Sequence, residues 1–391
     1  MRHAFTLDPG TVHLNHGSFG AVPRVVQEEQ RRVRDRADAN PMRFHRVELP
    51  ERIERARHVA ARMLGAGASE LALVRNVTEA TTTVVATLAH LGRLGPGEVV
   101  LVNDHGYGAV RLCLEQWCRR FGATLETVHL PLSCEEEDVV ARHRAALDGI
   151  GSRGDRVALV VVDAVTSPTG ARLPVSRLTG LAREAGAYSF VDAAHAPGHL
   201  EASPTSSGAD FWAGAFHKWG FAPRGTSALW VAEPLRDRVQ PPITSWNRDE
   251  PFPANFDWHG TDDYSGWLCL DAAVRFWGEA GGFGGVRERR DMVEQGRSTV
   301  TDAVVTARDV EVPDAALPRS PAPCLRLVPL PGGVADAEGP ADALYHALSA
   351  RGVEAQVLCW GGRGYVRLSA APYNEPADYG RLADLLAEML R

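Results

Sequence analysis

The chain has 391 residues, of which 45% are hydrophobic and 23% charged, and its net charge is -7. This balance is typical of a globular protein of about two domains with a large core, and the negative charge argues against a nucleic-acid partner or an anionic membrane surface. The six cysteines include no CxxC pair, so we predict no metal site. We see no signal-peptide pattern and no apolar run long enough to span a bilayer. We therefore predict a reduced, cytoplasmic protein without a membrane partner.

Short apolar runs alternate with amphipathic helical patterns along the first half of the chain. A helix is predicted at 51–64, ended by Gly65. Strands are predicted at 71–74, 99–102, 124–128, 157–162 and 188–191, and helices from about Ala80, at 109–120 and at 176–185. This order is typical of an α/β fold in which helices cover both faces of a mainly parallel sheet.

The pattern changes after the first two thirds of the chain. The glycine cluster at 281–285 is predicted to be a linker, followed by a long charged helix and shorter elements that end with a helix at 377–391. We therefore predict a large domain at 21–280 and a smaller α+β domain at 281–391. The N-terminal segment 1–20 is expected to pack with the small domain and the active site.

Lys218 is the single lysine among the 42 lysine and arginine residues, and it lies in the apolar, glycine-rich segment 215–220. Arginine stays protonated, whereas a desolvated lysine amine loses its proton more readily and forms a Schiff base with a carbonyl group. Biased codon usage explains the arginines but not the setting of the one lysine. We predict a Schiff-base lysine, for which pyridoxal 5'-phosphate (PLP) supplies an aldehyde, an electron-accepting ring and a phosphate.

Other residues match the parts of that cofactor. Asp192 ends the 188–191 strand and suits the ring nitrogen, with a turn or helix cap as the alternative. Thr78 lies between a strand and a helix, where backbone donors bind phosphate, and His217 is a further donor. Tyr107 is a candidate to stack on the ring, with His105 as a competitor and a structural role as the alternative.

Arg367 suggests the substrate. It alternates with apolar residues in a predicted strand near 365–370, where an arginine indicates a specific anion. A bidentate guanidinium suits the carboxylate of a small-molecule substrate of the amino-acid type, although the chain has many other arginines.

Together these segments resemble the class V aminotransferase family of fold type I PLP enzymes, and most closely its isopenicillin N epimerase-like branch. The resemblance covers nearly the whole chain, and the matching segments are 14–20, 40–44, 76–80, 192–198, 217–219, 260–261 and 367–374. It implies a large domain with a mainly parallel seven-stranded sheet, a smaller α+β C-terminal domain and a homodimer with active sites at the interface.

The resemblance also implies the site. The catalytic residues are Lys218, Asp192 and Tyr107. The cofactor-binding residues are Thr78, Glu79, Ala80, Tyr107, Ser167, Asp192, His195, His217, Lys218, Gly260 and Thr261, the last pair reaching the phosphate of the partner subunit. The substrate-binding residues are Arg367, Asn15, Gly17 and Ser18.

Three positions depart from related proteins. Ala215 stands where many relatives have a serine or threonine at the phosphate, and Ser167 stands where cysteine desulfurases have an asparagine. The long loop with a nucleophilic cysteine is absent, because Cys359 is close to Arg367 and is interpreted as structural. A desulfurase that forms a persulfide is therefore disfavoured.

The implied activity is chemistry at Cα or Cβ of an amino acid or its conjugate, through an external aldimine and a quinonoid, in bacterial secondary metabolism such as antibiotic biosynthesis. We expect β-elimination with C–S cleavage, or Cα epimerisation, of a bulky substrate. Decarboxylation with oxidative deamination to an aldehyde, and a non-catalytic binding protein, are the alternatives. Epimerisation needs an acid opposite Lys218, for which Tyr107, His105 and His16 are candidates.

The aromatic stretch from Trp246 to His259 bears on substrate size. Its aromatic residues are Trp246, Phe252, Phe256, Trp258 and His259. We interpret it either as a wall for a large substrate or as core of a dimer interface.

Overall fold

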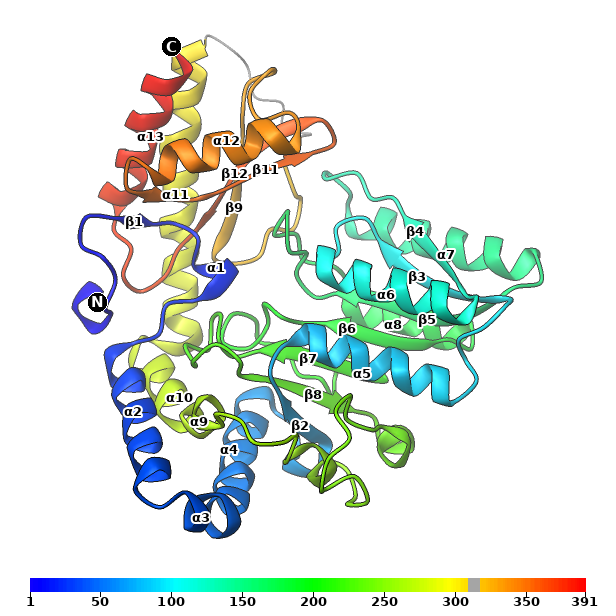
Figure 1. The fold of residues 1–391 in the computed structure, drawn as a ribbon. Helices are drawn as coiled ribbons and strands as arrows, with labels where there is room; N and C mark the ends of the chain where they lie inside the picture. The colour runs from blue at the N-terminus through cyan, green and yellow to red at the C-terminus, as the bar shows by residue number, and fades with distance from the viewer. Residues whose placement is uncertain (309–316) are drawn as a thin grey trace.

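The computed structural model describes residues 1–308 and 317–391, and a seven-stranded sheet forms its centre (Figure 1). The strand order is β2-β8-β7-β6-β5-β3-β4. These strands are β2 (Leu71–Val74), β3 (Glu98–Asn103), β4 (Thr124–Val128), β5 (Arg156–Asp163), β6 (Tyr188–Asp192), β7 (Phe211–Ala215) and β8 (Ser227–Val231). Only β8 runs antiparallel to its neighbours in this sheet, so the predicted α/β fold with a mainly parallel seven-stranded sheet is confirmed.

Helices cover both faces of the large sheet because its central strands are apolar on both sides. Along β5, Leu159 and Val161 face a core shared with helices α5 and α6, whereas Val160 and Val162 face a second core. The helices are α2 (Arg24–Ala39), α4 (Leu49–Leu64), α5 (Val77–His90), α6 (Gly108–Phe121), α7 (Glu136–Ser152), α8 (Val175–Glu184), α9 (Ser265–Leu268) and α10 (Leu270–Glu279). Packing on both faces holds the parallel strands in register, so their carboxyl ends lie along one edge of the sheet.

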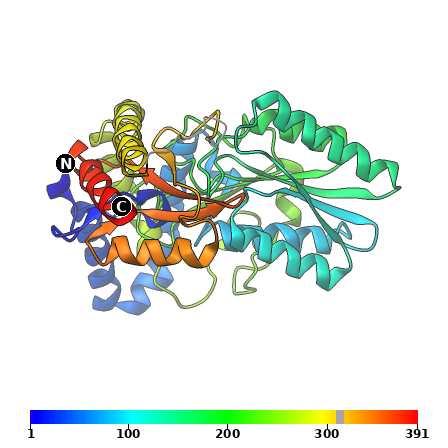
Figure 2. The same ribbon diagram turned by 90° about the horizontal axis from the view of Figure 1, so that it is seen from above.

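The small domain packs at one end of this sheet, on the side where both chain termini lie (Figures 1 and 2). It has an antiparallel sheet with the order β11-β12-β9. Its elements are α11 (Gly282–Arg308), β9 (Leu325–Pro329), α12 (Glu338–Ser349), β10 (Val353–Glu354), β11 (Gln356–Trp360), β12 (Arg363–Ser369) and α13 (Pro376–Leu390).

The glycine cluster predicted to be a linker instead forms the first turn of α11. Gly285 packs against the preceding turn so closely that an added Cβ would lie 2.3 Å from the carbonyl oxygen of Ala280. The glycines therefore serve a close backbone approach, which a composition-based reading does not distinguish from a hinge.

The N-terminal segment joins the small domain. Strand β1 (Val12–His13) pairs in parallel with β10, and the Ser369 N–H donates to the Leu14 carbonyl over 2.8 Å. Helix α1 (His16–Phe19) follows at once and lies between the two domains. The exact domain boundaries stay a prediction.

The remaining described elements are short: η1 (Arg2–Ala4), α3 (Pro41–Arg43), η2 (Phe44–Glu48), η3 (Ala68–Glu70), η4 (Glu233–Arg238) and η5 (Ala254–Phe256). Within 1–308 and 317–391, no helix combines the length and apolar character that crossing a membrane requires.

Candidate active site

A cavity of about 510 Å³ lies where the large sheet meets the small domain. Its walls come from the carboxyl ends of β5, β6 and β7, the start of α5, helix α1, and strands β11 and β12. The predicted site residues that line it are Gly17, Ser18, Thr78, Tyr107, Ser167, Asp192, His195, His217, Lys218 and Arg367. Open α/β sheets bind ligands at this edge, because parallel strands end there together.

Lys218 enters the cavity from the turn after β7. Its Nζ lies 3.1 Å from Nε2 of His195. Burial lowers the pKa of Lys218 to about 8, since desolvation disfavours the ammonium; the charge of Asp192 opposes this shift and that of Arg367 adds to it. A sizeable neutral fraction therefore exists near neutral pH, which a nucleophile or a base requires.

Two buried carboxyl groups lie side by side below the lysine. Asp163 on β5 and Asp192 on β6 are register partners and are 3% and 5% exposed. Asn103 donates to Asp163 over 2.7 Å, and the Ala194 N–H donates to Asp192 over 3.0 Å. Burial and then the charge of Asp192 raise the pKa of Asp163 to about 8. Burial raises the pKa of Asp192 as well, but the Ala194 N–H and the charge of Lys218 act against this shift, so Asp163 carries the proton and Asp192 is the better anion.

Arg367 enters the cavity from β12. Its guanidinium donates to the Ser167 carbonyl oxygen, to Asn15 Oδ1 over 3.1 Å and to Ser18 Oγ over 3.0 Å. Burial lowers its pKa only to about 10, so it stays charged at neutral pH. Its Nε is buried without a hydrogen-bond partner among the described residues. A buried charged donor without a partner is costly, so this group suits a bound carboxylate.

The start of α5 forms a third part of the wall. Asn76 caps the helix by accepting from the Glu79 N–H over 2.9 Å, and its carbonyl accepts from the Ala80 N–H over 3.2 Å. The N–H groups of Val77 and Thr78, in the first turn, make no hydrogen bond within the helix. Such donors at a helix start suit a phosphate, and both residues line the cavity.

His217 lies beside this helix start. Burial lowers its pKa to about 4, so it is neutral, and its Nδ1 is buried without a partner in the described ranges. The Thr226 backbone lies near the ring and acts to raise the His217 pKa against the effect of burial. The role of His217 at a phosphate stays a prediction.

Several predicted residues lie outside the cavity. Glu79 and Ala80 use their N–H groups on Asn76, and the Glu79 carboxylate turns back to Arg75 over 3.0 Å. Asn15 acts through Arg367. Gly260 and Thr261 lie in the loop between η5 and α9, where Thr261 is exposed. Their roles toward a partner subunit stay predictions.

The aromatic stretch does not line the cavity of its own chain. Phe252 and Phe256 pack in the core beneath α5, and Trp258 stacks on Tyr264 with ring centroids 5.7 Å apart. Trp246 is 88% exposed. Most of the stretch is thus ordinary core, and its apolar residues do not require a large substrate.

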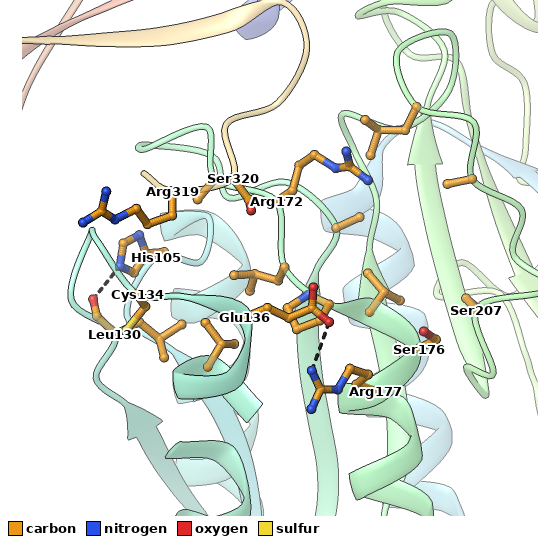
Figure 3. A pocket seen from close by; sticks show the side chains of 18 of the residues that line it. His105, Leu130, Cys134, Glu136, Arg172, Ser176, Arg177, Ser207, Arg319 and Ser320 are labelled. Atoms are coloured by element: carbon orange, nitrogen blue, oxygen red, sulfur yellow. Dashed lines mark hydrogen bonds and ion pairs between the residues drawn. The ribbon is translucent and has the colours of Figure 1, made fainter. Parts of the chain in front are cut away.

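A second cavity of about 540 Å³ is lined in part by Ala164 and residues 171–174, in the segment between β5 and α8 (Figure 3). His105 lines it, and its ring nitrogens lie 2.7 Å from the Leu130 carbonyl oxygen and 2.8 Å from Thr169 Oγ1. Arg177 in the same wall is paired with Glu136 over 3.1 Å. The structure therefore separates His105 from Lys218 and leaves Tyr107, which lines the first cavity, as the aromatic candidate there.

His16 supports the lysine from behind. Its Nε2 lies 3.0 Å from the Lys218 carbonyl oxygen, and its Nδ1 lies 3.1 Å from the Tyr373 hydroxyl. Burial lowers its pKa to about 3, so it is neutral. Since it does not line the cavity as the described residues define it, His16 has no route to the substrate as an acid.

Sequence reasoning assigned no role to four residues near the site. Asp163 directly follows the predicted 157–162 strand, and its place among the polar residues at strand ends was the available signal. Trp219 adjoins Lys218 and bonds His195. Gln356 and Leu358 on β11 line the cavity beside Arg367, a proximity that only strand pairing creates.

The arrangement fits PLP. An amine with a lowered pKa, a buried carboxylate, a free helix start and a neutral histidine with an unpartnered nitrogen supply one group for each part of that cofactor. Arg367 remains for a substrate carboxylate. None of the six cysteines lines this cavity as the described residues form it, which agrees with a structural Cys359.

Comparison with known proteins gives a consistent result. The family described as aminotransferase class-V matches residues 15–301. Isopenicillin N epimerase of Streptomyces clavuligerus is 34% identical over 77% of this chain and 77% of its own length. L-cysteine desulfhydrase of Arabidopsis thaliana is 26% identical over 98% of this chain and 88% of its own length. A solved structure of C-DES with glycine covalently linked to its PLP cofactor covers 99% of both chains with a TM-score of 0.79 and 17% identity.

Proposed function

This chain belongs to the class V aminotransferase family, and from that premise we propose that it is a PLP-dependent C–S lyase acting on cysteine or a cysteine conjugate. In this reaction the C–S bond at Cβ breaks and one water is consumed. Pyruvate and ammonia leave together with hydrogen sulfide when the substrate is cysteine, or with a thiol when it is an S-substituted cysteine. The family and its relatives support an enzyme rather than the non-catalytic alternative.

The observation that carries the proposal is the pairing of one amine with one free guanidinium face in a single cavity. Arg367 presents a buried Nε that has no partner among the residues that the structure describes, and Lys218 lies in the same cavity with a lowered pKa. Arg367 would hold the α-carboxylate, which leaves the Cα proton for Lys218 Nζ to accept. A retained carboxylate disfavours the decarboxylation alternative.

The cofactor, when bound, supplies an aldehyde for amines and a pyridine ring that withdraws electrons from Cα. We assign the ring nitrogen to the Asp192 carboxylate, the ring face to Tyr107, and the ring hydroxyl side to Ser167 and His195. The phosphate is assigned to the start of α5, with Thr78, and to His217. Departure of a thiolate from Cβ needs no second acid on the face opposite Lys218, and this favours elimination.

Epimerisation is the second candidate, because the epimerase of Streptomyces clavuligerus is 34% identical to this chain. It needs a proton donor opposite Lys218. Tyr107 is the one of the three acids considered that lines the cavity. Its side chain is 48% exposed, so solvent would also reach this position.

Product analysis in D2O separates the candidates. The protein is incubated with L-cysteine, L-cystine and S-substituted cysteines, and pyruvate, ammonia and thiol are measured by mass spectrometry. Equal amounts of pyruvate and thiol are expected. Unchanged substrate with deuterium at Cα and inverted configuration would replace elimination by epimerisation, and carbon dioxide with an aldehyde would contradict both.

We further propose a homodimer in which Gly260 and Thr261 reach the partner's phosphate site. The large apolar side chains Trp246, Met42 and Phe19 are 88%, 72% and 72% exposed, which suits burial by a second copy. Light scattering measures the mass of the protein in solution, which should be that of a dimer. If Thr261 reaches the partner's phosphate site, Thr261→Ala should lower the affinity for PLP. A cytoplasmic location in a secondary-metabolic pathway is part of this proposal.

A further inference from the structure

Trp219, His195 and Lys218 form a hydrogen-bonded chain that ends at the amine. The Trp219 indole Nε1 lies 3.2 Å from His195 Nδ1, and His195 Nε2 lies 3.1 Å from Lys218 Nζ. Trp219 and His195 are 3% and 2% exposed. Water therefore has little access to the bond between Trp219 and His195.

Donor chemistry fixes the direction of every bond in this chain. An indole N–H only donates, so His195 Nδ1 must be the acceptor and carries no proton. Burial and the nearby charges of Lys218 and Arg367 lower the pKa of His195 well below its ordinary value, so the ring is neutral. The proton of a neutral ring without a proton on Nδ1 lies on Nε2, which must donate to Lys218.

That donation selects the state of the lysine. An ammonium group has three donors and no lone pair, so it cannot accept a bond from His195 Nε2–H. A neutral amine can. The contact at 3.1 Å is therefore satisfied only by the neutral form of Lys218.

The surroundings hold both rings in place. His199 accepts from the Cys324 N–H over 2.9 Å, so its other nitrogen donates to the His195 carbonyl over 3.2 Å. Its ring stacks on Trp219 with centroids 4.2 Å apart. Gly17 closes the other side, where an added Cβ would lie 3.3 Å from Trp219 and 3.4 Å from His195. Little freedom remains for His195 to flip.

We infer that Trp219 is a positioning residue which, through the tautomer of His195, holds the Lys218 amine neutral and aimed into the cavity before a cofactor binds. Among the charged groups facing the amine, Asp192 favours the ammonium, whereas Arg367 opposes it. The indole thus favours the neutral amine and so opposes the effect of the Asp192 carboxylate, which favours the ammonium. The inference concerns the free lysine, so it stands apart from which bond the enzyme cleaves.

The single lysine makes a direct test possible. Protein grown with 13Cε-lysine has one lysine signal, and its titration in the full chain stripped of cofactor gives the pKa of Lys218. We expect a pKa near 8 for the native protein. Trp219→Phe keeps a buried aromatic ring but removes the donor, and the pKa should rise by roughly one unit, because a bond to the neutral amine is lost.

Trp230→Phe is the matched control, since Trp230 is also buried and its indole bonds Glu70 over 3.2 Å, away from the site. It should leave the lysine titration unchanged. An unchanged pKa in Trp219→Phe would overturn the inference, as would an equal shift in both variants.

A second measurement needs no folded Trp219 variant. In 15N-histidine-labelled native protein, the His195 signals, assigned by their loss in His195→Gln, should show a protonated Nε2 and an unprotonated Nδ1. The reverse pattern would refute the inference even if Trp219→Phe failed to fold.

Discussion

The two ends of the cavity are built from different kinds of contact. Lys218 and Asp192 belong to one sheet, on or just after neighbouring strands whose pairing fixes their spacing. Arg367 instead depends on Asn15, Ser18 and the Ser167 carbonyl, which are 352, 349 and 200 residues away in the sequence. The cofactor end is therefore set by one packed core, whereas the substrate end exists only after the N-terminal segment and the small domain have docked.

This contrast predicts that changes at the sheet end alter the chemistry itself, whereas changes at the docked end alter substrate binding first. Four substitutions test it, two at each end.

Lys218→Ala should cause the largest loss. Without the amine no group in the cavity can take its place, and we expect kcat to fall by at least about 10³-fold together with loss of the visible absorption of the bound cofactor. Lys218→Arg is the control, because it keeps the charge but cannot release the proton. Activity retained in Lys218→Arg would show that charge, not proton transfer, is what the position supplies.

Asp163→Asn tests the sheet end through stability. The folded pKa of Asp163 is about 8, above the unfolded value of 3.8, so its contribution is complete below the unfolded pKa and is lost as pH rises through the folded one. The variant without a titrating group should be more stable than the native protein at pH 8, by on the order of 3 kcal/mol, and similar at pH 4.

Urea unfolding of the cofactor-free protein at both pH values measures this difference. Asp148→Asn, at an exposed position on α7, is the control and should show little change. If the free energies of unfolding of Asp163→Asn and the native protein differed by the same amount at both pH values, the protonated state of Asp163 would be refuted.

Arg367→Gln tests the docked end. We expect kcat/KM to fall roughly 10²-fold, mainly through KM, since the charged bonds to the substrate carboxylate are lost. The affinity for PLP should stay within a few-fold of native, as measured by fluorescence titration. Loss of cofactor affinity equal to the loss of substrate affinity would mean that the two ends are not separate.

Asn15→Ala should have the smallest effect. The guanidinium keeps its bonds to Ser18 and the Ser167 carbonyl, so one neutral-to-charged bond is removed. We expect KM for the amino acid to rise by roughly 5- to 10-fold with kcat unchanged. Steady-state kinetics beside Ser18→Ala would show whether the two supports act alike, and a fall in kcat alone would contradict a role through Arg367.

The sequence predicted most of the large domain because its signals are local. The predicted strands at 71–74 and 124–128 coincide with β2 and β4, and the helix at 51–64 ends at Gly65, which has the left-handed conformation that glycine favours. Lys218 and Asp192 could be chosen early for the same reason. A single lysine in an apolar turn and an acid at a strand end are visible without any knowledge of neighbours.

The rest depended on contacts between distant segments. Sequence spacing gave no sign that His105 would face a different cavity from Tyr107, two residues away. That outcome follows from where neighbouring loops place the partners of the His105 ring, which are the Leu130 carbonyl oxygen and Thr169 Oγ1.

Taken by itself, the sequence determined the fold class and the cofactor and predicted Lys218 as the residue that bonds it, because each depends on local periodicity or on residue chemistry. Only the tertiary structure decided that the Nε of Arg367 finds no partner within residues 1–308 and 317–391, that Asp163 pairs with Asp192 in a buried site, and that His195 lies between Trp219 and the amine. The physical reason is that burial and hydrogen-bond direction are properties of neighbours, and these neighbours are separated by up to several hundred residues along the chain.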